Sequence, residues 1–344
     1  MSRILALADR RWPAATGIGV VQRELECRCP PSIEIIDLEA KGSIGHPLSP
    51  LRLTTALSKK RVHQKRVFLS YGFVPPLFAR EPTIVIIHDL THLHFYGRIK
   101  RTYYNLIMKK LFQRCAAIVC VSKSTANELL NWSDIPSDSV HVIYNGVSDA
   151  FSPRSETSIK PFPYIFYPGN HRNYKNLGRL VEAFLASALP GRGVRLLLTG
   201  EIEVELANAA KRSGLDNYLI FCGHVPSNEM PALYGGALAV AFLSLYEGFG
   251  LPIVEAMASG VPLVTSNVSC MPEITAGAAL MVNPYDVPAI TGALERVCFD
   301  EVVRSRLISA GINRARQFNW DQSANAFWSL VANIADSAND SLNV

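Results

Sequence analysis

Residues 244–260 read SLYEGFGLPIVEAMASG, which places two glutamates around a glycine-rich loop. The apolar run at 239–242 just before it predicts a buried strand. A helix is expected at 253–259, because Pro252 suits its first turn and the small residues and glycine at the far end suit its termination. The stretch therefore predicts a strand, a loop and a helix in that order, with Glu247 ahead of the loop and Glu255 inside the helix.

The same order of elements runs through the whole chain, where short apolar runs alternate with helical patterns. Two series of six predicted strands result: 4–8, 33–37, 67–70, 83–87, 117–121 and 140–143, then 164–167, 195–199, 219–222, 239–242, 263–265 and 279–282. Continuous apolar strands separated by helices indicate parallel sheets built from βαβ units. We therefore predict an α/β protein with two doubly wound domains, and 344 residues are enough for two.

The boundary between the two series falls in the stretch 146–163, which contains three prolines and little periodicity. We assign residues 1–150 to the first domain, 151–163 to a linker and 164–318 to the second domain. Hydrophobic residues make up 49% of the chain and charged residues 18%, which argues against long disordered segments.

Lysine and arginine are concentrated in the first 150 residues, which contain 20 of them against 12 Asp and Glu; the remainder contains 14 against 17. Most of the excess lies in two clusters: Lys59, Lys60, Arg61, Lys65 and Arg66, then Arg98, Lys100, Arg101, Lys109, Lys110 and Arg114. Such clusters suit phospholipid, a phosphorylated substrate or nucleic acid, or they are solvated helix faces. Motifs of nucleic-acid-binding proteins do not accompany them, so we predict no nucleic-acid partner.

Seven cysteines are scattered without the paired spacing of a zinc site, which predicts reduced thiols and a cytoplasmic protein. The N-terminal apolar run is too short for a signal peptide, and no stretch approaches the ~18 apolar residues of a membrane-spanning helix. We therefore expect any contact with a membrane to be peripheral.

Polar and glycine-rich segments follow several predicted strands at their carboxyl ends, where open parallel sheets bind ligands. After the first strand, AATGIGV at 14–20 carries Gly17 and Gly19 in a loop ahead of a helix that we expect from residue 20. These glycines suit either the close approach of a ligand phosphate or a plain tight turn. His88 and Asp89 follow the fourth strand, and His88 suits either a polar ligand or a backbone hydrogen bond. The neighbouring histidines do not share one face with His88, which argues against a metal site.

In the second half, residues 167–176 read YPGNHRNYKN, between a predicted strand and a helix. Arg172 and Lys175 then precede a helix N-terminus, where two cations beside backbone N–H groups suit a pyrophosphate. Glu247 and Glu255 suit the hydroxyl groups of a sugar and of a ribose. The competing interpretation is that the cations are solvated and that the acids stabilise the helix dipole.

Together these segments resemble the retaining family 4 glycosyltransferases. The similarity is carried by YPGNHRNYKNLGRLVEAF, FCGHVPSNEMPALYGGALAV and SLYEGFGLPIVEAMASGVPLVTSNVSCMPEI, and in the first half by TGIGVVQREL, IIHDLTHLHF, IVCVSKSTANELL and VIYNGV. It reaches FNWDQSANAFWSL and so covers nearly the whole chain. The resemblance implies the GT-B fold: two facing Rossmann-like domains with a cleft between them, and a last helix at 319–344 that crosses back to the first domain.

The resemblance also implies a role for each residue of the second, nucleotide-sugar-binding domain. Glu255 would bond the ribose hydroxyls, Glu247 would contact the donor sugar, and Lys175 with Arg172 would neutralise the diphosphate. Asn170 stands where many relatives have an arginine. The residues implied to contact the donor also include Asn170, His224, Val225, Gly248, Phe249, Gly250 and Leu251.

In the first, acceptor-binding domain, the resemblance implies that Gly17 and Gly19 approach phosphate and sugar, and that His88 bonds the transferred sugar. The implied reaction proceeds on one face of the donor sugar, and the leaving phosphate oxygen helps to deprotonate the acceptor. Catalysis is then mainly stabilisation of the departing diphosphate, with no metal or other cofactor.

The segment HDLTHLHF at 88–95 resembles mannosyltransferases that use GDP-mannose to build bacterial surface polysaccharide. This implies a glycan or polyprenyl-diphosphate-linked acceptor, reached from the cytoplasm by a basic first domain resting on the anionic inner face of the plasma membrane. Three alternatives remain: a transferase that uses a UDP-sugar, a UDP-sugar 2-epimerase of the same architecture, and a subunit that binds a nucleotide-sugar without catalysis.

Overall fold

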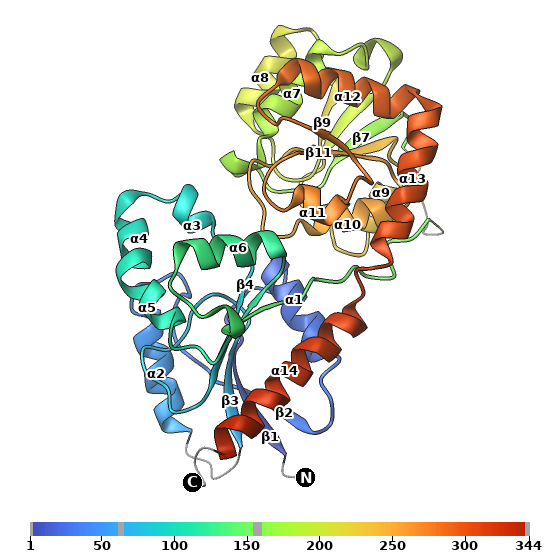
Figure 1. The fold of residues 1–344 in the computed structure, drawn as a ribbon. Helices are drawn as coiled ribbons and strands as arrows, with labels where there is room; N and C mark the ends of the chain where they lie inside the picture. The colour runs from blue at the N-terminus through green and yellow to red at the C-terminus, as the bar shows by residue number, and fades with distance from the viewer. Residues whose placement is uncertain (1–2, 61–64, 154–159, 341–344) are drawn as a thin grey trace. The chain divides into compact units, whose positions relative to one another are not determined.

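The structure is a computed structural model that describes residues 3–60, 65–153 and 160–340. The chain divides into two units, Met1–Gly146 with Asn319–Val344 and then Val147–Phe318. Each unit contains one six-stranded parallel sheet surrounded by helices (Figure 1). Within the predicted linker, residues 154–159 lie outside the described residues, as does Arg61 of the first basic cluster.

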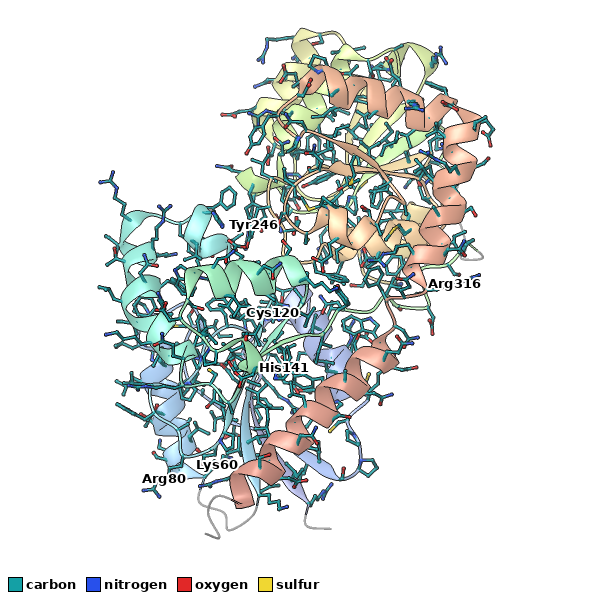
Figure 2. The ribbon with its side chains drawn as sticks, in the orientation of Figure 1. Lys60, Arg80, Cys120, His141, Tyr246 and Arg316 are labelled. Carbon is teal, nitrogen blue, oxygen red and sulfur yellow. The ribbon has the colours of Figure 1, made fainter. Side chains whose placement is uncertain are left out.

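The first sheet has the strand order β2-β1-β3-β4-β5-β6. Its strands are β1 (Ile4–Asp9), β2 (Ile33–Asp37), β3 (Arg66–Ser70), β4 (Thr83–Ile87), β5 (Ala117–Cys120) and β6 (Val140–Val142). The helices of this unit are α1 (Gly17–Glu26), α2 (Ser49–Lys59), α3 (Thr91–His94), α4 (Arg98–Tyr103), the π-helical η1 (Tyr104–Met108), α5 (Lys109–Phe112), α6 (Lys123–Trp132), η2 (Ser137–Ser139) and α14 (Trp320–Asp340). Figure 2 labels Cys120 and His141 on the neighbouring strands β5 and β6.

The second sheet has the strand order β12-β11-β10-β7-β8-β9. Its strands are β7 (Tyr164–Tyr167), β8 (Arg195–Leu198), β9 (Leu219–Phe221), β10 (Ala239–Phe242), β11 (Leu263–Ser266) and β12 (Leu280–Val282). The helices are η3 (Asn173–Lys175), α7 (Leu177–Ala186), η4 (Pro190–Arg192), α8 (Val204–Arg212), η5 (Asp216–Tyr218), α9 (Met230–Gly235), α10 (Leu251–Ala258), α11 (Met271–Thr275), α12 (Val287–Phe299) and α13 (Glu301–Ala315).

All twelve predicted strands are present, and no observed end differs from its predicted position by more than one residue. The helix expected from residue 20 begins earlier, because the Thr16 hydroxyl accepts from the backbone N–H of Gly19 and caps α1. Gly17 and Gly19 therefore lie inside the first turn of α1, and the expectation that they form a loop ahead of the helix is wrong. The helix expected at 253–259 is α10, which starts two residues earlier, directly after Gly250.

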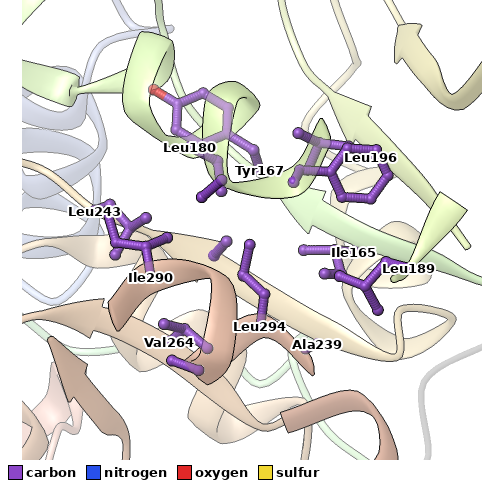
Figure 3. Close-up of a cluster of buried hydrophobic side chains, with 14 of the residues drawn as sticks. Ile165, Tyr167, Leu180, Leu189, Leu196, Ala239, Leu243, Val264, Ile290 and Leu294 are labelled. Carbon is purple, nitrogen blue, oxygen red and sulfur yellow. The ribbon is translucent and has the colours of Figure 1, made fainter. Parts of the chain in front are cut away.

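Apolar side chains on both sides of each sheet explain why the strands read as continuous hydrophobic runs. All six residues of β1, all five of β4 and all four of β7 and β10 are buried. Figure 3 shows one core cluster of the second unit, in which Ile165, Leu196 and Val264 from three strands meet Leu180 from α7 and Leu294 from α12. This packing fixes the positions of the strand ends, at which the loops that follow them begin.

The C-terminal helix α14 belongs to the first unit. The buried indole N–H of Trp328 donates to the carbonyl of Leu25 at 2.8 Å, and the Ser323 hydroxyl donates to the carbonyl of Tyr144 at 2.6 Å. A Cβ atom on Gly146 would lie 2.4 Å from the backbone nitrogen of Trp320, so the chain can pass this close to α14 only with glycine at that position.

Strand order reverses once in each sheet. In the first sheet the reversal lies between β1 and β3, and in the second it lies between β7 and β10. At such a point the loops after two neighbouring strands leave in opposite directions and open a crevice at the carboxyl ends. The order of the strands thus directs attention to the loops after β1 and β3, and to those after β7 and β10.

Candidate functional site

The loops that follow β7 and β10 meet at the reversal point of the second sheet. The backbone N–H of Leu245 donates to the carbonyl of Tyr174 at 2.7 Å. Beside this bond, the Lys175 ammonium donates to Glu247 Oε1 at 2.5 Å, and each of the two side chains is only 12% exposed. Water and salt screen such a pair less than a surface pair. A cation and a carboxylate predicted to serve one ligand therefore lie side by side.

Local geometry fixes the position of Lys175. The residue ends the short turn η3, and the next residue, Asn176, adopts a left-handed conformation with φ of 60° before α7 begins. Asn176 is buried, and its side-chain amide donates to the carbonyl of Pro284 at 2.7 Å. The Lys175 ammonium also lies 5.2 Å from the ring centroids of both Tyr174 and Phe242, where the ring faces favour a cation.

A serine hydroxyl fixes the backbone of Glu247. Ser269 Oγ accepts from the Glu247 N–H at 3.2 Å and donates to the Glu247 carbonyl at 2.6 Å, so both backbone groups of one residue are bonded to one hydroxyl. Ser269 itself has a φ of 55°, a conformation that a β-carbon disfavours. The loop after β11 thus adopts an unfavourable backbone conformation at the point where it orients Glu247.

The glycine-rich loop between the two glutamates is largely buried. Phe249 is buried and packs edge-on against Phe318, with ring centroids 5.5 Å apart. Because that side chain belongs to the core, Phe249 can reach a ligand only through its backbone. Gly250 has a φ of 82° and immediately precedes α10, which Leu251 begins. A side chain at Gly250 would be strained in this conformation.

Glu255 lies on α10 and is oriented by a residue from α9. The hydroxyl of Tyr234, a fully buried residue, donates to Glu255 Oε2 at 2.6 Å. Burial raises the pKa of Glu255 to about 7, and the hydrogen bond from Tyr234 acts in the opposite direction. The ionised and neutral forms of this carboxyl group are therefore nearly balanced at neutral pH. The ionised form is the stronger acceptor of hydroxyl hydrogen bonds.

Removing the Tyr234 hydroxyl should shift the pH dependence of nucleotide binding. In Tyr234→Phe the carboxylate loses a donor, so the pKa of Glu255 rises further and nucleotide affinity should increase with pH over a higher range than in the wild type. Isothermal titration of a nucleoside diphosphate across neutral pH measures this shift. Glu255→Gln is the control, because it should lose the component of pH dependence due to this carboxyl. Identical profiles for the wild type and Tyr234→Phe would show that Tyr234 only packs.

Arg172 and Asn170 occupy the exposed rim of the loop after β7. Asn170 Oδ1 accepts from the Arg172 N–H at 3.3 Å, and the Asn170 carbonyl accepts from the Tyr167 hydroxyl at 2.7 Å. Arg172 borders a hollow of about 880 Å³ between α7 and α8, and it also interacts with the Tyr174 hydroxyl. The structure thus pairs Lys175 with Glu247, whereas Arg172 lies on the outer side of the same loop.

His224 and Val225 follow β9, the edge strand of the second sheet. The chain reaches them through Gly223, which exchanges two backbone hydrogen bonds with Gly200 at 2.8 and 3.1 Å. His224 is exposed and Val225 partly so. In the strand order, β8 lies between β9 and β7, the strand at the reversal point. A ligand bound at the reversal point would therefore contact His224 and Val225 only if it extended along the carboxyl edge of the sheet.

In the first unit, His88 is bonded to the backbone. Its Nε2 lies 2.7 Å from the carbonyl of Tyr71, the residue directly after β3. A carbonyl only accepts, so Nε2 carries the proton and Nδ1 keeps its lone pair. Burial lowers the pKa of His88, which keeps the ring neutral. His88 therefore presents one acceptor nitrogen, suited to a hydroxyl group, at the carboxyl end of β4.

Gly19 has a packing role that the sequence did not predict. It is buried, and a Cβ atom there would lie 2.3 Å from the carbonyl oxygen of Pro13. The loop after β1 thus packs on the first turn of α1 at a distance that only glycine permits. Gly17 is exposed at the start of the helix.

Metal-binding geometry is missing from the described parts of both units: in residues 3–60, 65–153 and 160–340, no three His, Cys, Asp or Glu side chains are grouped to hold an ion. His92 is buried and stacks on Tyr104 at 3.6 Å between ring centroids, and His94 pairs with Glu128.

All seven cysteines are free thiols. Among the helices described, none is both long and apolar enough to cross a membrane.

Two family models match consecutive parts of the chain. The model described as Glycosyltransferase Family 4 matches residues 60–151, and the model described as Glycosyl transferases group 1 matches residues 149–314. The chain belongs to the glycosyltransferases. The second match covers the loops after β7 and β10, so the Lys175–Glu247 pair and Glu255 lie within a glycosyltransferase domain.

Curated relatives of this glycosyltransferase include two from Escherichia coli. It is 28% identical to O-antigen chain mannosyltransferase B over 270 residues, which is 72% of this chain and 70% of that protein. It is 29% identical to serotype-specific mannosyltransferase WbdA over 266 residues, which is 70% of this chain but only 32% of that protein. The glycosyltransferase thus matches about a third of the second relative.

Solved structures share the fold of the glycosyltransferase at low sequence identity. Sucrose-phosphate synthase from Thermosynechococcus elongatus has a TM-score of 0.78 at 16% identity, over 97% of this chain and 100% of that one. Anabaena HepE, in complex with UDP and glucose, has a TM-score of 0.74 at 16% identity, over 97% and 100%. The two parallel six-stranded sheets are those of the GT-B fold.

Three residues that position the predicted site of the glycosyltransferase were not predicted from the sequence: Tyr234, Ser269 and Asn176. Only Asn176 carries a local signal, since asparagine tolerates the left-handed conformation found there. Tyr234 bonds a residue 21 positions away, and Ser269 bonds one 22 positions away. No periodicity or short motif encodes such pairs.

Proposed function

We propose that this glycosyltransferase transfers a mannosyl group from GDP-mannose, with retention of anomeric configuration, to an acceptor used in bacterial surface polysaccharide synthesis. The observation that carries the proposal is the Lys175–Glu247 pair at the reversal point of the second sheet, with Glu255 on the helix that follows. The relatives named as mannosyltransferases, at 28% and 29% identity, support mannose as the transferred sugar.

Donor binding would use both glutamates and Lys175. Glu255 accepts from the ribose hydroxyls, Lys175 neutralises the diphosphate, and Glu247 accepts from the sugar hydroxyls. In the free protein Lys175 and Glu247 neutralise one another, so neither charge is left unpaired in a site with little exposure. When the diphosphate arrives, the ammonium gains an anionic partner and the carboxylate can turn to the sugar. Backbone groups of Gly248 and Gly250 border the same region.

Catalysis would consist mainly of charge stabilisation. As the bond between the anomeric carbon and the phosphate oxygen breaks, negative charge grows on the diphosphate, and a cation held in a poorly solvated site stabilises that charge more than water does. The leaving oxygen then accepts the proton of the acceptor hydroxyl on the same face of the sugar, which gives retention. Arg172 is the second cation that we assign to the diphosphate. No divalent metal takes part in the proposed reaction.

The first unit would supply the acceptor side. We assign to His88 a hydrogen bond from a hydroxyl of the transferred sugar to its unprotonated Nδ1, because Nε2 is already used by Tyr71. The proposed acceptor is a glycan carried on a polyprenyl diphosphate at the inner face of the plasma membrane. The excess of Lys and Arg in residues 1–150 supports this location, because the cytoplasmic leaflet is negatively charged.

A panel of nucleotides tests the donor proposal. We expect GDP and GDP-mannose to raise the melting temperature of the purified protein more than UDP, ADP or their sugars, because a ligand that binds only the folded state stabilises it by mass action. Differential scanning fluorimetry at equal ligand concentrations measures the shifts. Retention is tested separately, by the anomeric configuration of the product in a nuclear magnetic resonance spectrum.

A UDP-sugar is the second candidate donor, favoured by the similarity to HepE, which was solved with UDP and glucose. A melting-temperature shift with UDP alone would support this candidate and would contradict the mannose proposal. Incubating the protein with a UDP-sugar in the absence of acceptor would then separate transfer from epimerisation at the second carbon. Binding without turnover of any donor would support a non-catalytic subunit.

A further inference from the structure

A stretch without acidic residues contains one continuous helical segment on the surface of the first unit. No Asp or Glu occurs between Asp89 and Glu128, whereas seven Lys and Arg do. Within this stretch α4, η1 and α5 follow one another without a break, and Figure 1 shows α4 and α5 along one side of the unit. We call the outward side of residues 98–110 the basic face.

Burial shows which side of this segment faces outward. Four apolar or aromatic side chains point into the core: Tyr104, Met108, Leu111 and Phe112. Ile99 and Leu106, two helical turns apart, project the other way and are 89% and 62% exposed. Both lie on the basic face. An aliphatic pair this exposed, between basic residues, is typical of an interaction surface rather than of a solvated helix.

The charges around the two aliphatic side chains are mostly uncompensated. Lys109 pairs with Asp134 at 3.0 Å, and the Lys100 ammonium lies 4.8 Å from the ring centroid of Tyr96. Within the described residues, no ion pair or hydrogen bond involves the side chains of three other basic residues: Arg98, Arg101 and Lys110. The basic face thus combines unpaired positive charge with protruding hydrocarbon.

The other basic cluster differs in the pairing of two of its cations. Lys65 pairs with Asp336 at 2.8 Å, and Arg66 pairs with Glu81, a buried carboxylate, at 2.9 Å. These cations serve the packing of α14 and of the strand β3. Lys60 follows the C-terminal end of α2, away from α4 (Figure 2). The two clusters look equivalent in the sequence, but in the structure Lys65 and Arg66 are paired with carboxylates.

We propose that the basic face docks the protein onto an anionic phospholipid surface, with Ile99 and Leu106 entering the headgroup region. A phospholipid bilayer offers both partners that this face needs: anionic headgroups for Arg98, Arg101 and Lys110, and an apolar layer for the two aliphatic side chains. Nucleic acid would satisfy the charges but would leave the hydrocarbon in water. Stacking of Tyr104 on the buried His92 holds the segment rigidly from beneath.

The inference rests on the proposed function in one respect, since it supplies the surface at which a lipid-linked acceptor would be presented. The geometry of the segment is independent of the donor. Vesicle binding can therefore be measured without donor or acceptor, and donor binding can be measured without vesicles. Failure of one leaves the other standing.

Two variants and a matched control test the proposal by co-sedimentation with vesicles of phosphatidylcholine, with and without phosphatidylglycerol. The apolar variant is Ile99→Ser/Leu106→Ser, and the charge variant is Arg98→Gln/Arg101→Gln/Lys110→Gln. The control, Lys41→Gln/Lys59→Gln/Lys60→Gln, removes the same charge elsewhere on the first unit. All replaced side chains lie on the surface, so thermal melting curves should match the wild type.

We expect the wild type to bind the anionic vesicles and to bind phosphatidylcholine alone much more weakly. The charge variant should lose roughly 100-fold in affinity, at about 1 kcal/mol for each basic side chain. The apolar variant should lose roughly 10-fold or more, and its remaining binding should disappear at high salt. The control should lose clearly less than the charge variant.

Three results would overturn the proposal: no binding of the wild type to anionic vesicles, equal losses in the control and the charge variant, or an apolar variant that binds like the wild type. The last result, combined with tight binding of single-stranded nucleic acid, would point to a polyanion as the partner of the basic face.

Discussion

Replacing Lys175 by alanine should strongly reduce the preference of the protein for a nucleoside diphosphate over the corresponding monophosphate. The ammonium is the cation that the structure holds beside Glu247, 12% exposed and supported by two aromatic rings. A hydrogen bond to a charged group contributes about 1.5–3 kcal/mol, so diphosphate affinity should fall roughly 10- to 100-fold, with little change for the monophosphate. If the lysine also stabilises the leaving group, kcat should fall by about 10²–10³.

Isothermal titration with the two nucleotides measures this ratio. Because both ligands share the nucleoside, a general loss of stability would affect them equally and leave the ratio unchanged. Lys211→Ala, at an exposed lysine of α8, is the matched control and should behave as the wild type. Glu247→Gln controls for the carboxylate that the variant leaves without its cation. An unaltered ratio in Lys175→Ala would remove this residue from the diphosphate site.

Glu255→Ala should weaken nucleotide binding to a similar extent, but through the ribose. The wild type should bind a ribonucleotide roughly 10- to 100-fold more tightly than its dideoxyribose counterpart, which lacks both ribose hydroxyls, because the carboxylate accepts from them. In the variant this preference should vanish, and only the affinity for the ribonucleotide should fall. The same calorimetric titration, with the two sugars compared, measures the effect.

The buried hydroxyl of Tyr234 loses its partner in Glu255→Ala, which costs some stability. Combining the change with Tyr234→Phe removes that cost, so the double variant should regain stability without regaining the ribose preference. Glu229→Ala, at an exposed residue directly before α9, is the control for removing a carboxylate nearby. If Glu255→Ala still prefers the ribonucleotide, the ribose assignment is wrong.

The sequence by itself determined the fold class. Each of the twelve strands was predicted to within one residue, because a strand buried on both faces must be a continuous apolar run and because glycine or proline punctuates the loops. The predicted start of α1 was wrong. The glycine-rich pattern equally suits a loop, and the sequence did not show that the Gly19 N–H would donate to Thr16 and cap an earlier start.

Motif spacing also placed Lys175, Glu247 and Glu255 close to strand ends, but it did not show that Lys175 and Glu247 meet. Their association depends on strand order: β10 pairs with β7 although β8 and β9 lie between them in the chain. That pairing joins the loop of Tyr174 to the loop of Leu245 through one backbone hydrogen bond and brings the Lys175 ammonium to Glu247. Strand order is a property of the folded sheet and is not written in any single segment.

Tertiary structure alone decided how the site residues are oriented and which basic side chains are paired with carboxylates. The bonds from Ser269 to the Glu247 backbone and from Tyr234 to Glu255 join separate elements, and so do the pairs of Lys65 with Asp336 and Arg66 with Glu81. A local pattern reports only whether a side chain faces core or solvent. Partner, distance and residual charge depend on which distant element packs beside it, and that is set only when the whole chain has folded.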